Sequence, residues 1–307
     1  MTDSGVWWTK AWNPVTGCTP ASKGCEHCFA ATLHNKRHAA WLDGWRDAPE
    51  CYRKHFFEIQ LFPERLQQPL RWRKPQDVFV CNMGDLFHAD VPDEFIDRMF
   101  AVMALAPQHR FYVLTKRAAR MLHFLSDDAA RVDGIARGWV DLVGPTMGTH
   151  ETNMRWARAN HISVRERERR NSIRAACYRN SYITQRFRPL SNVLLGATIE
   201  NQARANERLP HLMTRAALGW KTFVSVEPML GPVDLASAAD VTYWDDPSAG
   251  LKWVVCGGES GPGARPMDPA WARSLRDQCQ AAGIPFWFKQ MSGRAEIPAD
   301  LRVREKP

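Results

Sequence analysis

Short apolar runs alternate with stretches of helical pattern along most of the chain. Seven runs have the length and apolar character of strands, at 8–16, 77–81, 110–115, 192–199, 222–226, 252–256 and 285–289. Helices are predicted between them, over about 27–42, 92–104, 118–125, 201–212 and 269–282. Continuous apolar runs are typical of strands buried on both faces, and strands that alternate with helices form parallel sheets. We therefore predict an α/β fold, a partial parallel (β/α) barrel in a single domain over 1–307.

One segment, 126–189, interrupts this alternation. It is too long for an ordinary connection in a barrel, so we expect an insertion. Between 153 and 188 it carries ten arginines, two glutamates and no lysine, a net charge of +8 that equals the +8 of the whole chain. Because guanidinium groups suit phosphate, the predicted partner is a nucleic acid that contacts Arg169, Arg170 and Arg174. A partner protein and a plain solvated face remain alternatives, since the chain has no recognised nucleic-acid-binding motif.

Hydropathy and the first residues predict where the chain resides. No apolar run approaches the roughly 18 residues that span a bilayer. The first residues lack the basic start and apolar stretch of a signal peptide. We therefore expect a cytoplasmic protein without membrane contact. In a reducing compartment, clustered cysteines indicate a metal site or catalysis rather than disulfides.

Three of the eight cysteines, Cys18, Cys25 and Cys28, lie within eleven residues. Their loop follows the first predicted strand, at the carboxyl end of the barrel, where barrel active sites form. Three thiolates on a four-iron cluster would leave one iron open for a substrate or cofactor. The spacing therefore favours an iron–sulfur cluster.

Two other interpretations of these cysteines stay open. A structural zinc site would take its fourth ligand from His27, His34 or Cys51. The protein would then be a non-catalytic, zinc-stabilised protein that binds nucleic acid or protein through its arginines. Alternatively, the three cysteines are unrelated buried residues.

The motifs around the cysteines point to a family. They are Trp8-Thr9-x-x-Trp12-Asn13-Pro14-Val15-Thr16-Gly17-Cys18, Gly24-Cys25-x-x-Cys28, Asn82-Met83-x-Asp85-Leu86-Phe87-His88, Leu114-Thr115-Lys116-Arg117, Glu200-Asn201-Gln202, Ser225-Val226-Glu227-Pro228 and Gly257-Gly258-Glu259-Ser260-Gly261. With them the chain resembles the phage-associated three-cysteine-motif family of the radical S-adenosylmethionine superfamily. The resemblance covers most of the chain outside 126–189.

The resemblance implies a radical enzyme. It implies a [4Fe-4S] cluster on Cys18, Cys25 and Cys28, an electron donor for that cluster, and S-adenosylmethionine bound at the open iron. Reductive cleavage of that cofactor would yield a 5′-deoxyadenosyl radical. With the arginine-rich segment in mind, we expect the substrate to be a nucleic acid or nucleotide.

The ends of the predicted strands supply the cofactor-binding candidates. By the resemblance, Gly84 and Asp85 take the place of an acidic turn that contacts the methionyl ammonium group. Glu200 and Asn201 are candidates for the ribose hydroxyls. The full cofactor-binding set is His27, Phe29, Gly84, Asp85, Lys116, Glu200, Asn201, Gly257, Gly258 and Glu259. The alternatives are helix caps for the acidic and amide residues, a tight turn for the glycine pair, and a solvated face for Lys116.

Three further residues are catalytic candidates. Glu227 precedes a proline, so its backbone should be extended and its carboxylate should reach the barrel mouth, toward a substrate or a basic partner. Cys81 and Cys256 end strands, and each is either a small core residue or a thiol that donates a hydrogen atom to a substrate radical.

Overall fold

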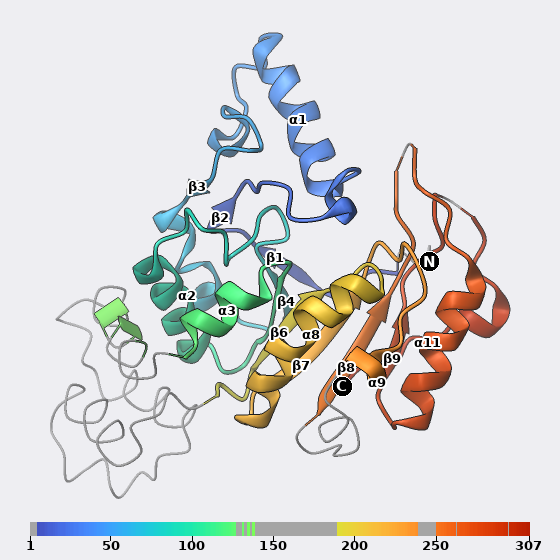
Figure 1. Ribbon diagram of the computed structural model, residues 1–307. Helices are drawn as coiled ribbons and strands as arrows, with labels where there is room; N and C mark the ends of the chain where they lie inside the picture. Colours follow the sequence, from blue (N-terminus) through green and yellow to red (C-terminus); the bar gives the residue numbers. More distant parts are fainter. Residues whose placement is uncertain are drawn as a thin grey trace, which may run out of the picture.

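A computed structural model of the protein describes residues 5–126, 131, 134, 135, 137, 138, 189–238, 250–261, 263–293 and 295–307 (Figure 1). Seven parallel strands form one open sheet. In spatial order they are β1 (Lys10–Trp12), β4 (Asp77–Val80), β5 (Arg110–Thr115), β6 (Val193–Thr198), β7 (Lys221–Val226), β8 (Leu251–Cys256) and β9 (Phe286–Phe288). Spatial order equals chain order, so each crossover adds the next strand on the same side, as in a barrel. The predicted partial (β/α) barrel is confirmed at this level.

Helices cover one face of the sheet. They are α2 (Asp93–Leu105), α3 (Ala118–Phe124), α8 (Gln202–Ala217), α9 (Leu235–Ala238) and α11 (Pro269–Ala281). Local signals set their starts: Pro92 precedes the acidic first turn of α2, and the side chain of Asp268 accepts a hydrogen bond from the Ala270 N–H ahead of α11. Short 3-10 turns complete the connections, η1 (Lys23–Cys25), η2 (Glu50–Tyr52), η3 (Pro63–Arg65), η4 (Gln68–Arg71) and η5 (Ala299–Leu301).

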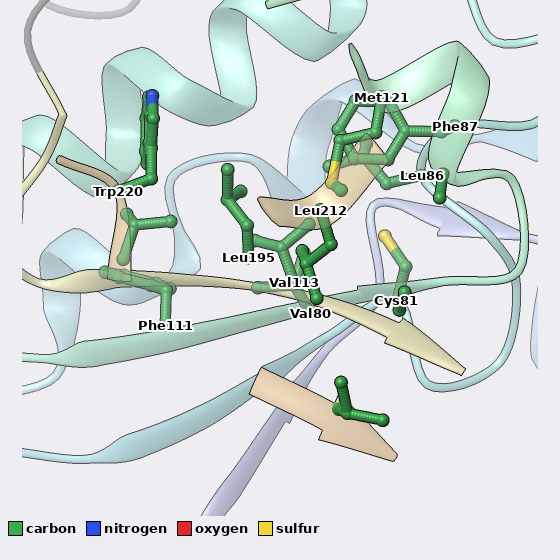
Figure 2. Close-up of a cluster of buried hydrophobic side chains, with 14 of the residues drawn as sticks. Val80, Cys81, Leu86, Phe87, Phe111, Val113, Met121, Leu195, Leu212 and Trp220 are labelled. Atoms are coloured by element: carbon green, nitrogen blue, oxygen red, sulfur yellow. The ribbon is translucent and has the colours of Figure 1, made fainter. Parts of the chain in front are cut away.

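Between helices and sheet lies an aliphatic core. Figure 2 shows Val80, Val113 and Leu195 from three adjacent strands against Leu212 of α8 and Met121 of α3. All five side chains are fully buried. Burial of this continuous layer is the main force that fixes the helices on the sheet.

The opposite face of the sheet carries a second cluster, which we call the aromatic plug. It consists of Trp7, Tyr112, Leu194, Phe223, Trp253, Val255 and Trp287, with Trp8, Phe79 and Leu114 packed against it. Its strand residues alternate with those of the aliphatic core, as a period of two requires. The ring of Trp253 contacts those of Trp7, Tyr112, Phe223 and Trp287 at centroid distances of 5.2, 5.5, 5.9 and 6.2 Å.

Two segments, 5–9 and 303–307, link the edges of the open sheet. The Trp287 indole of β9 donates to the Gly5 carbonyl at 3.1 Å, and the chain then runs from Gly5 into β1 at the other edge. Backbone hydrogen bonds also join 303–305 to β9. Lys306 then reaches Asp77 of β4 at 2.6 Å. Both segments therefore brace the sheet where a closed barrel would have further strands.

Helix α1 (Phe29–Leu42) departs from the barrel pattern. Only Ala30 and His34 of its 14 residues are buried, and it projects away from the sheet in Figure 1 (blue). It packs on η2 instead. A two-residue antiparallel pair, β2 (Val15–Thr16) with β3 (Gln60–Leu61), joins this region to the sheet.

The predicted insertion joins two neighbouring strands, because β5 and β6 pair directly from Phe111↔Val193 onward. Arg169, Arg170 and Arg174 lie outside the described residues, so their predicted contacts stay predictions. Within the described part of the chain, no helix is long and apolar enough to cross a membrane.

Candidate functional site

The cysteine loop, residues 17–28, lies at the carboxyl ends of the strands. The Gly17 N–H donates to the Met83 carbonyl after β4 at 3.0 Å, and the Cys18 N–H donates to the Phe56 carbonyl at 3.1 Å. Gly17 has φ +89°, and a Cβ there would lie 2.3 Å from the Glu58 carbonyl oxygen, so only glycine fits. Cys18 is thereby fixed between the β4 turn and the α1 region.

The three thiols of this loop differ from the other described cysteines. Cys18, Cys25 and Cys28 are partly exposed, whereas the remaining ones are buried: Cys51, Cys81, Cys256 and Cys279. The Ala21 N–H donates to Cys25 Sγ at 3.4 Å, and Arg117 Nη1 donates to Cys18 Sγ at 3.4 Å. Burial and the nearby Asp85 raise the pKa of Cys18 to about 11, against the opposing effect of Arg117.

We tested whether these thiols suit a metal centre. The described residues contain no group of three or more His, Cys, Asp or Glu side chains that could hold a metal ion as they stand. A tetrahedral zinc site would need its sulfurs gathered about 2.3 Å from one ion. A four-iron cluster binds each thiolate at a different iron, and N–H donors to sulfur are typical of such sites. The loop offers three thiols, two of which accept N–H hydrogen bonds, and thiolates are the ligands that such a cluster uses.

Asp85 and Arg117 form the first of three contacts that hold the cysteine loop. Asp85 is buried, accepts from Thr115 Oγ1 at 2.7 Å, and binds Arg117 Nη1 at 3.1 Å. The other arm of Arg117 donates to the Thr19 carbonyl at 2.9 Å. His88 Nε2 is hydrogen-bonded to Thr19 Oγ1 at 2.7 Å. The β4 and β5 ends thus hold the start of the loop through Arg117.

Glu200, at the end of β6, makes the second contact. Its carboxylate accepts from Ser22 Oγ at 2.6 Å, from Lys116 Nζ at 3.0 Å and from Arg208 Nη1 at 3.2 Å. Burial alone would raise the pKa of this carboxyl, but the two cations and Ser22 outweigh it and the pKa is lowered. A Cβ on Gly24 would lie 2.5 Å from Glu200 Cγ, so the loop packs directly on this side chain.

Glu259, after β8, makes the third contact. It accepts from His27 Nδ1 at 2.8 Å and pairs with Arg265 Nη2 at 2.6 Å, while Arg265 Nη1 reaches Glu26 at 2.7 Å. Burial favours the neutral carboxyl, but the hydrogen bonds from Arg265 and His27 outweigh it and hold the pKa of Glu259 at about 2. The end of the loop is thereby tied to β8.

Three of the predicted cofactor-binding carboxylates, Asp85, Glu200 and Glu259, are thus already paired and tie down the cysteine loop. Of their cationic partners, Arg208 and Arg265 were not among the predicted residues. Arg117 directly follows Lys116, and two cations after a strand end were a usable signal for a carboxylate or phosphate partner. Arg208 and Arg265 had no such signal in the sequence, because the fold determines which side chains pair and the spacing of residues does not reveal it.

Glu227 is brought into a different pair. It follows β7 and accepts from Lys289 Nζ at 2.5 Å and Gln290 Nε2 at 2.9 Å, both just after β9. None of the sequence motifs includes Lys289 or Gln290, although Lys289 comes two residues after the buried Trp287, where a period of two returns to the same face.

The remaining predicted residues have local contacts of their own. The Asn201 side chain caps α8 by accepting from the Arg204 N–H at 3.1 Å. A Cβ on Gly84 would lie 2.9 Å from the Gly17 carbonyl oxygen, and one on Gly258 would lie 2.4 Å from Ser292 N, so both glycines permit close packing of the chain on itself. Phe29 is 57% exposed at the start of α1.

Cys81 and Cys256, the predicted hydrogen-atom donors, lie in the aliphatic core. Cys81 points among the apolar side chains of Figure 2, and both thiols are buried. Burial raises the pKa of Cys81 to about 12 and that of Cys256 well above its ordinary value. Their surroundings match the alternative prediction of small core residues.

The fold and this site define an α/β protein with an open parallel sheet and a cysteine loop held at its carboxyl edge. The chain belongs to the family described as "Protein of unknown function (DUF5131)", whose profile matches residues 3–305. No curated protein and no solved structure matches the chain.

Proposed function

We propose that the protein is a radical S-adenosylmethionine enzyme with a [4Fe-4S] cluster on Cys18, Cys25 and Cys28, acting on a nucleic acid or nucleotide. One observation carries this proposal. Three partly exposed thiols share one loop, and hydrogen bonds and an ion pair from three strand ends hold that loop at the carboxyl edge of a parallel sheet. This is the edge where barrel enzymes assemble their sites.

When bound, the cluster and its cofactor supply the chemistry, which is reductive cleavage of S-adenosylmethionine and abstraction of a hydrogen atom by the resulting radical. The chain contributes orientation and shielding. Arg117 places a cation beside Cys18, and the ties through Ser22 and His27 hold the other two cysteines in the same loop. The aromatic plug excludes water from the face of the sheet below.

The arginine-rich segment supports the choice of substrate class. Between 153 and 188 its ten arginines and two glutamates give a net charge of +8, which equals that of the entire chain. Local positive charge of this density suits a polyanion, which is the reason for proposing a nucleic acid or nucleotide.

Anaerobic purification and analysis test the cluster. We expect about four irons and four acid-labile sulfides per chain, and release of 5′-deoxyadenosine when the reduced protein meets S-adenosylmethionine. Replacement of Cys18, Cys25 or Cys28 by Ala should abolish both. Cys279→Ala, which removes a buried thiol far from the loop, serves as the matched control and should keep its iron. Zinc without sulfide, or a full cluster in the triple variant, would refute the proposal.

A further inference from the structure

Of the four carboxylates at the strand ends, three help to hold the cysteine loop in place and one does not. Asp85, Glu200 and Glu259 each contact it directly or through an arginine, and their side chains are 6%, 1% and 3% exposed. Among the described residues, Glu227 forms no hydrogen bond or ion pair with the loop. Its side chain is 21% exposed, and that of its partner Lys289 is 19% exposed. This pair is therefore accessible and has no part in holding the cysteines.

Strand periodicity places the pair on the same face as the aromatic plug. Phe223 in β7 and Trp287 in β9 belong to the plug, and Glu227 and Lys289 follow them by four and two residues, so they belong to the same face. Lys289 Nζ lies 5.7 Å from the ring centroid of Trp8, which packs against the plug. The pair thus lies at the carboxyl-side boundary of the plug.

Gly257 gives the pair its space. It follows β8, the strand between β7 and β9. A Cβ at this position would lie 3.1 Å from Gln290 Nε2 and 3.3 Å from Lys289 Cβ, so any side chain would crowd the pair. The absence of a side chain at Gly257 thus leaves room for the side chains of Lys289 and Gln290.

The pair keeps unused hydrogen-bonding capacity. Glu227 accepts through Oε1 from both Lys289 and Gln290, and its Oε2 has no hydrogen bond to any described residue. Lys289 Nζ carries three N–H donors and uses one on Glu227. Gln290 Nε2 also donates to the Gly258 carbonyl at 2.7 Å, which fixes the amide. An ammonium donor therefore lies beside a carboxylate acceptor on a rigid support.

We propose that Glu227 and Lys289, supported by Gln290, form a subsite for the guanine edge of the substrate. This inference rests on the proposed function, in that it assumes a nucleic acid or nucleotide substrate. Guanine presents a carbonyl oxygen beside two N–H groups on its pairing edge. The carbonyl would accept from Lys289, and the N–H groups would donate to Glu227 Oε2. Adenine has no carbonyl there, and uracil has one N–H between two carbonyls.

Equilibrium binding to the metal-free protein tests the subsite, because it needs neither cluster nor turnover. Isothermal titration calorimetry with GMP, AMP, CMP and UMP should show GMP binding tightest, by about tenfold or more over AMP. Glu227→Gln and Lys289→Met should each remove that preference. Lys306→Met, which breaks a lysine–carboxylate pair at the other end of the strands, is the matched control and should bind GMP like the unmodified protein.

Equal affinity for all four nucleotides, no nucleotide binding, or GMP binding indifferent to both substitutions would overturn the subsite. Circular dichroism of each variant establishes that it is folded. The cluster proposal is separable from this outcome. If the protein contains iron and releases 5′-deoxyadenosine but does not prefer GMP, only the subsite is refuted. If it prefers GMP but contains no cluster, only the cluster is refuted.

Discussion

The aromatic plug and the ion pairs around the cysteine loop lie on one sheet but hold the protein in different ways. The plug is a cluster built mainly of large rings, and the indoles of Trp253 and Trp287 donate to backbone carbonyls. The ion pairs are buried charges, each of which needs its partner to offset the cost of leaving water. Removal of a ring should therefore weaken the whole fold, whereas removal of a charge should mainly loosen the loop. Three substitutions test this contrast, and a fourth change, in the arginine-rich segment, should leave both regions unaffected.

Trp253→Ala should have the largest effect. The side chain is fully buried among four other aromatic rings, and its indole donates to the Glu305 carbonyl at 2.8 Å. Loss of a buried tryptophan costs about 3–5 kcal/mol through lost burial and the cavity left behind. Urea unfolding measures this loss, and Trp253→Phe should recover most of it. A loss below about 1 kcal/mol would mean that the plug is not the support we describe.

Glu259→Gln should come next, and its effect should depend on pH. The pKa of Glu259 lies near 2 in the folded protein, below the ordinary value of about 4.3, so the charged carboxylate stabilises the fold above pH 4–5. That stability, about 2–3 kcal/mol, is lost as the pH falls toward 2. The variant should therefore be less stable at neutral pH and lose less on acidification.

Thermal melting between about pH 6 and pH 3 measures this difference. Asp300→Asn is the control, because Asp300 also pairs with arginines but is 46% exposed, and solvent screens such pairs. Parallel pH profiles for Glu259→Gln and the unmodified protein would contradict the prediction.

Arg117→Met should have a smaller and more local effect. It removes the link from Asp85 to Thr19 and the donor to Cys18 Sγ, but Asp85 keeps its hydrogen bonds from Thr115 and the Phe87 N–H. We expect a loss of about 1–2 kcal/mol. Amide hydrogen exchange should accelerate in residues 17–28 and stay unchanged in β7 and β8. Acceleration throughout the sheet would show that the loop and plug are not separable.

Replacement of Arg169, Arg170 and Arg174 by Gln should leave stability nearly unchanged. If these residues contact phosphates, the affinity for single- or double-stranded nucleic acid should lose part of its salt dependence, by about 0.7–0.9 in the logarithmic slope for each contact. A salt titration of binding measures this slope. An unchanged slope would favour a protein partner or a solvated segment.

The sequence predicted the sheet well because its strands are buried on both faces. The runs at 110–115 and 222–226 need no distant partner to be recognised, and they agree with β5 and β7 within one residue. The place of α1 was not predictable in this way. Residues 29–42 are helical in pattern but lack an apolar stripe, so nothing in them fixes the helix on the sheet. The two-residue strands β2 and β3 are too short to leave a pattern.

For the site, the sequence predicted the carboxylates at the strand ends but not the residues with which they pair. Asp85, Glu200, Glu227 and Glu259 could be found because each follows an apolar run. Most of their partners could not, because Ser22 meets Glu200 across 178 positions and Lys289 meets Glu227 across 62. Pairings of this kind come from the curvature of the sheet, which brings separate strand ends together.

If the protein is the enzyme proposed above, the bracing segments 5–9 and 303–307, with the plug above them, have a consequence for turnover. With the plug they cover the face of the sheet opposite the helices, and Lys306 pairs with Asp77 at the amino end of β4, so ligands of the proposed enzyme would come and go at the carboxyl edge, past the cysteine loop. Entry and exit through one opening make exchange sequential: a spent molecule has to leave before the next one binds. We then expect product inhibition. Its strength would depend on how tightly Glu227 and Lys289 bind the product.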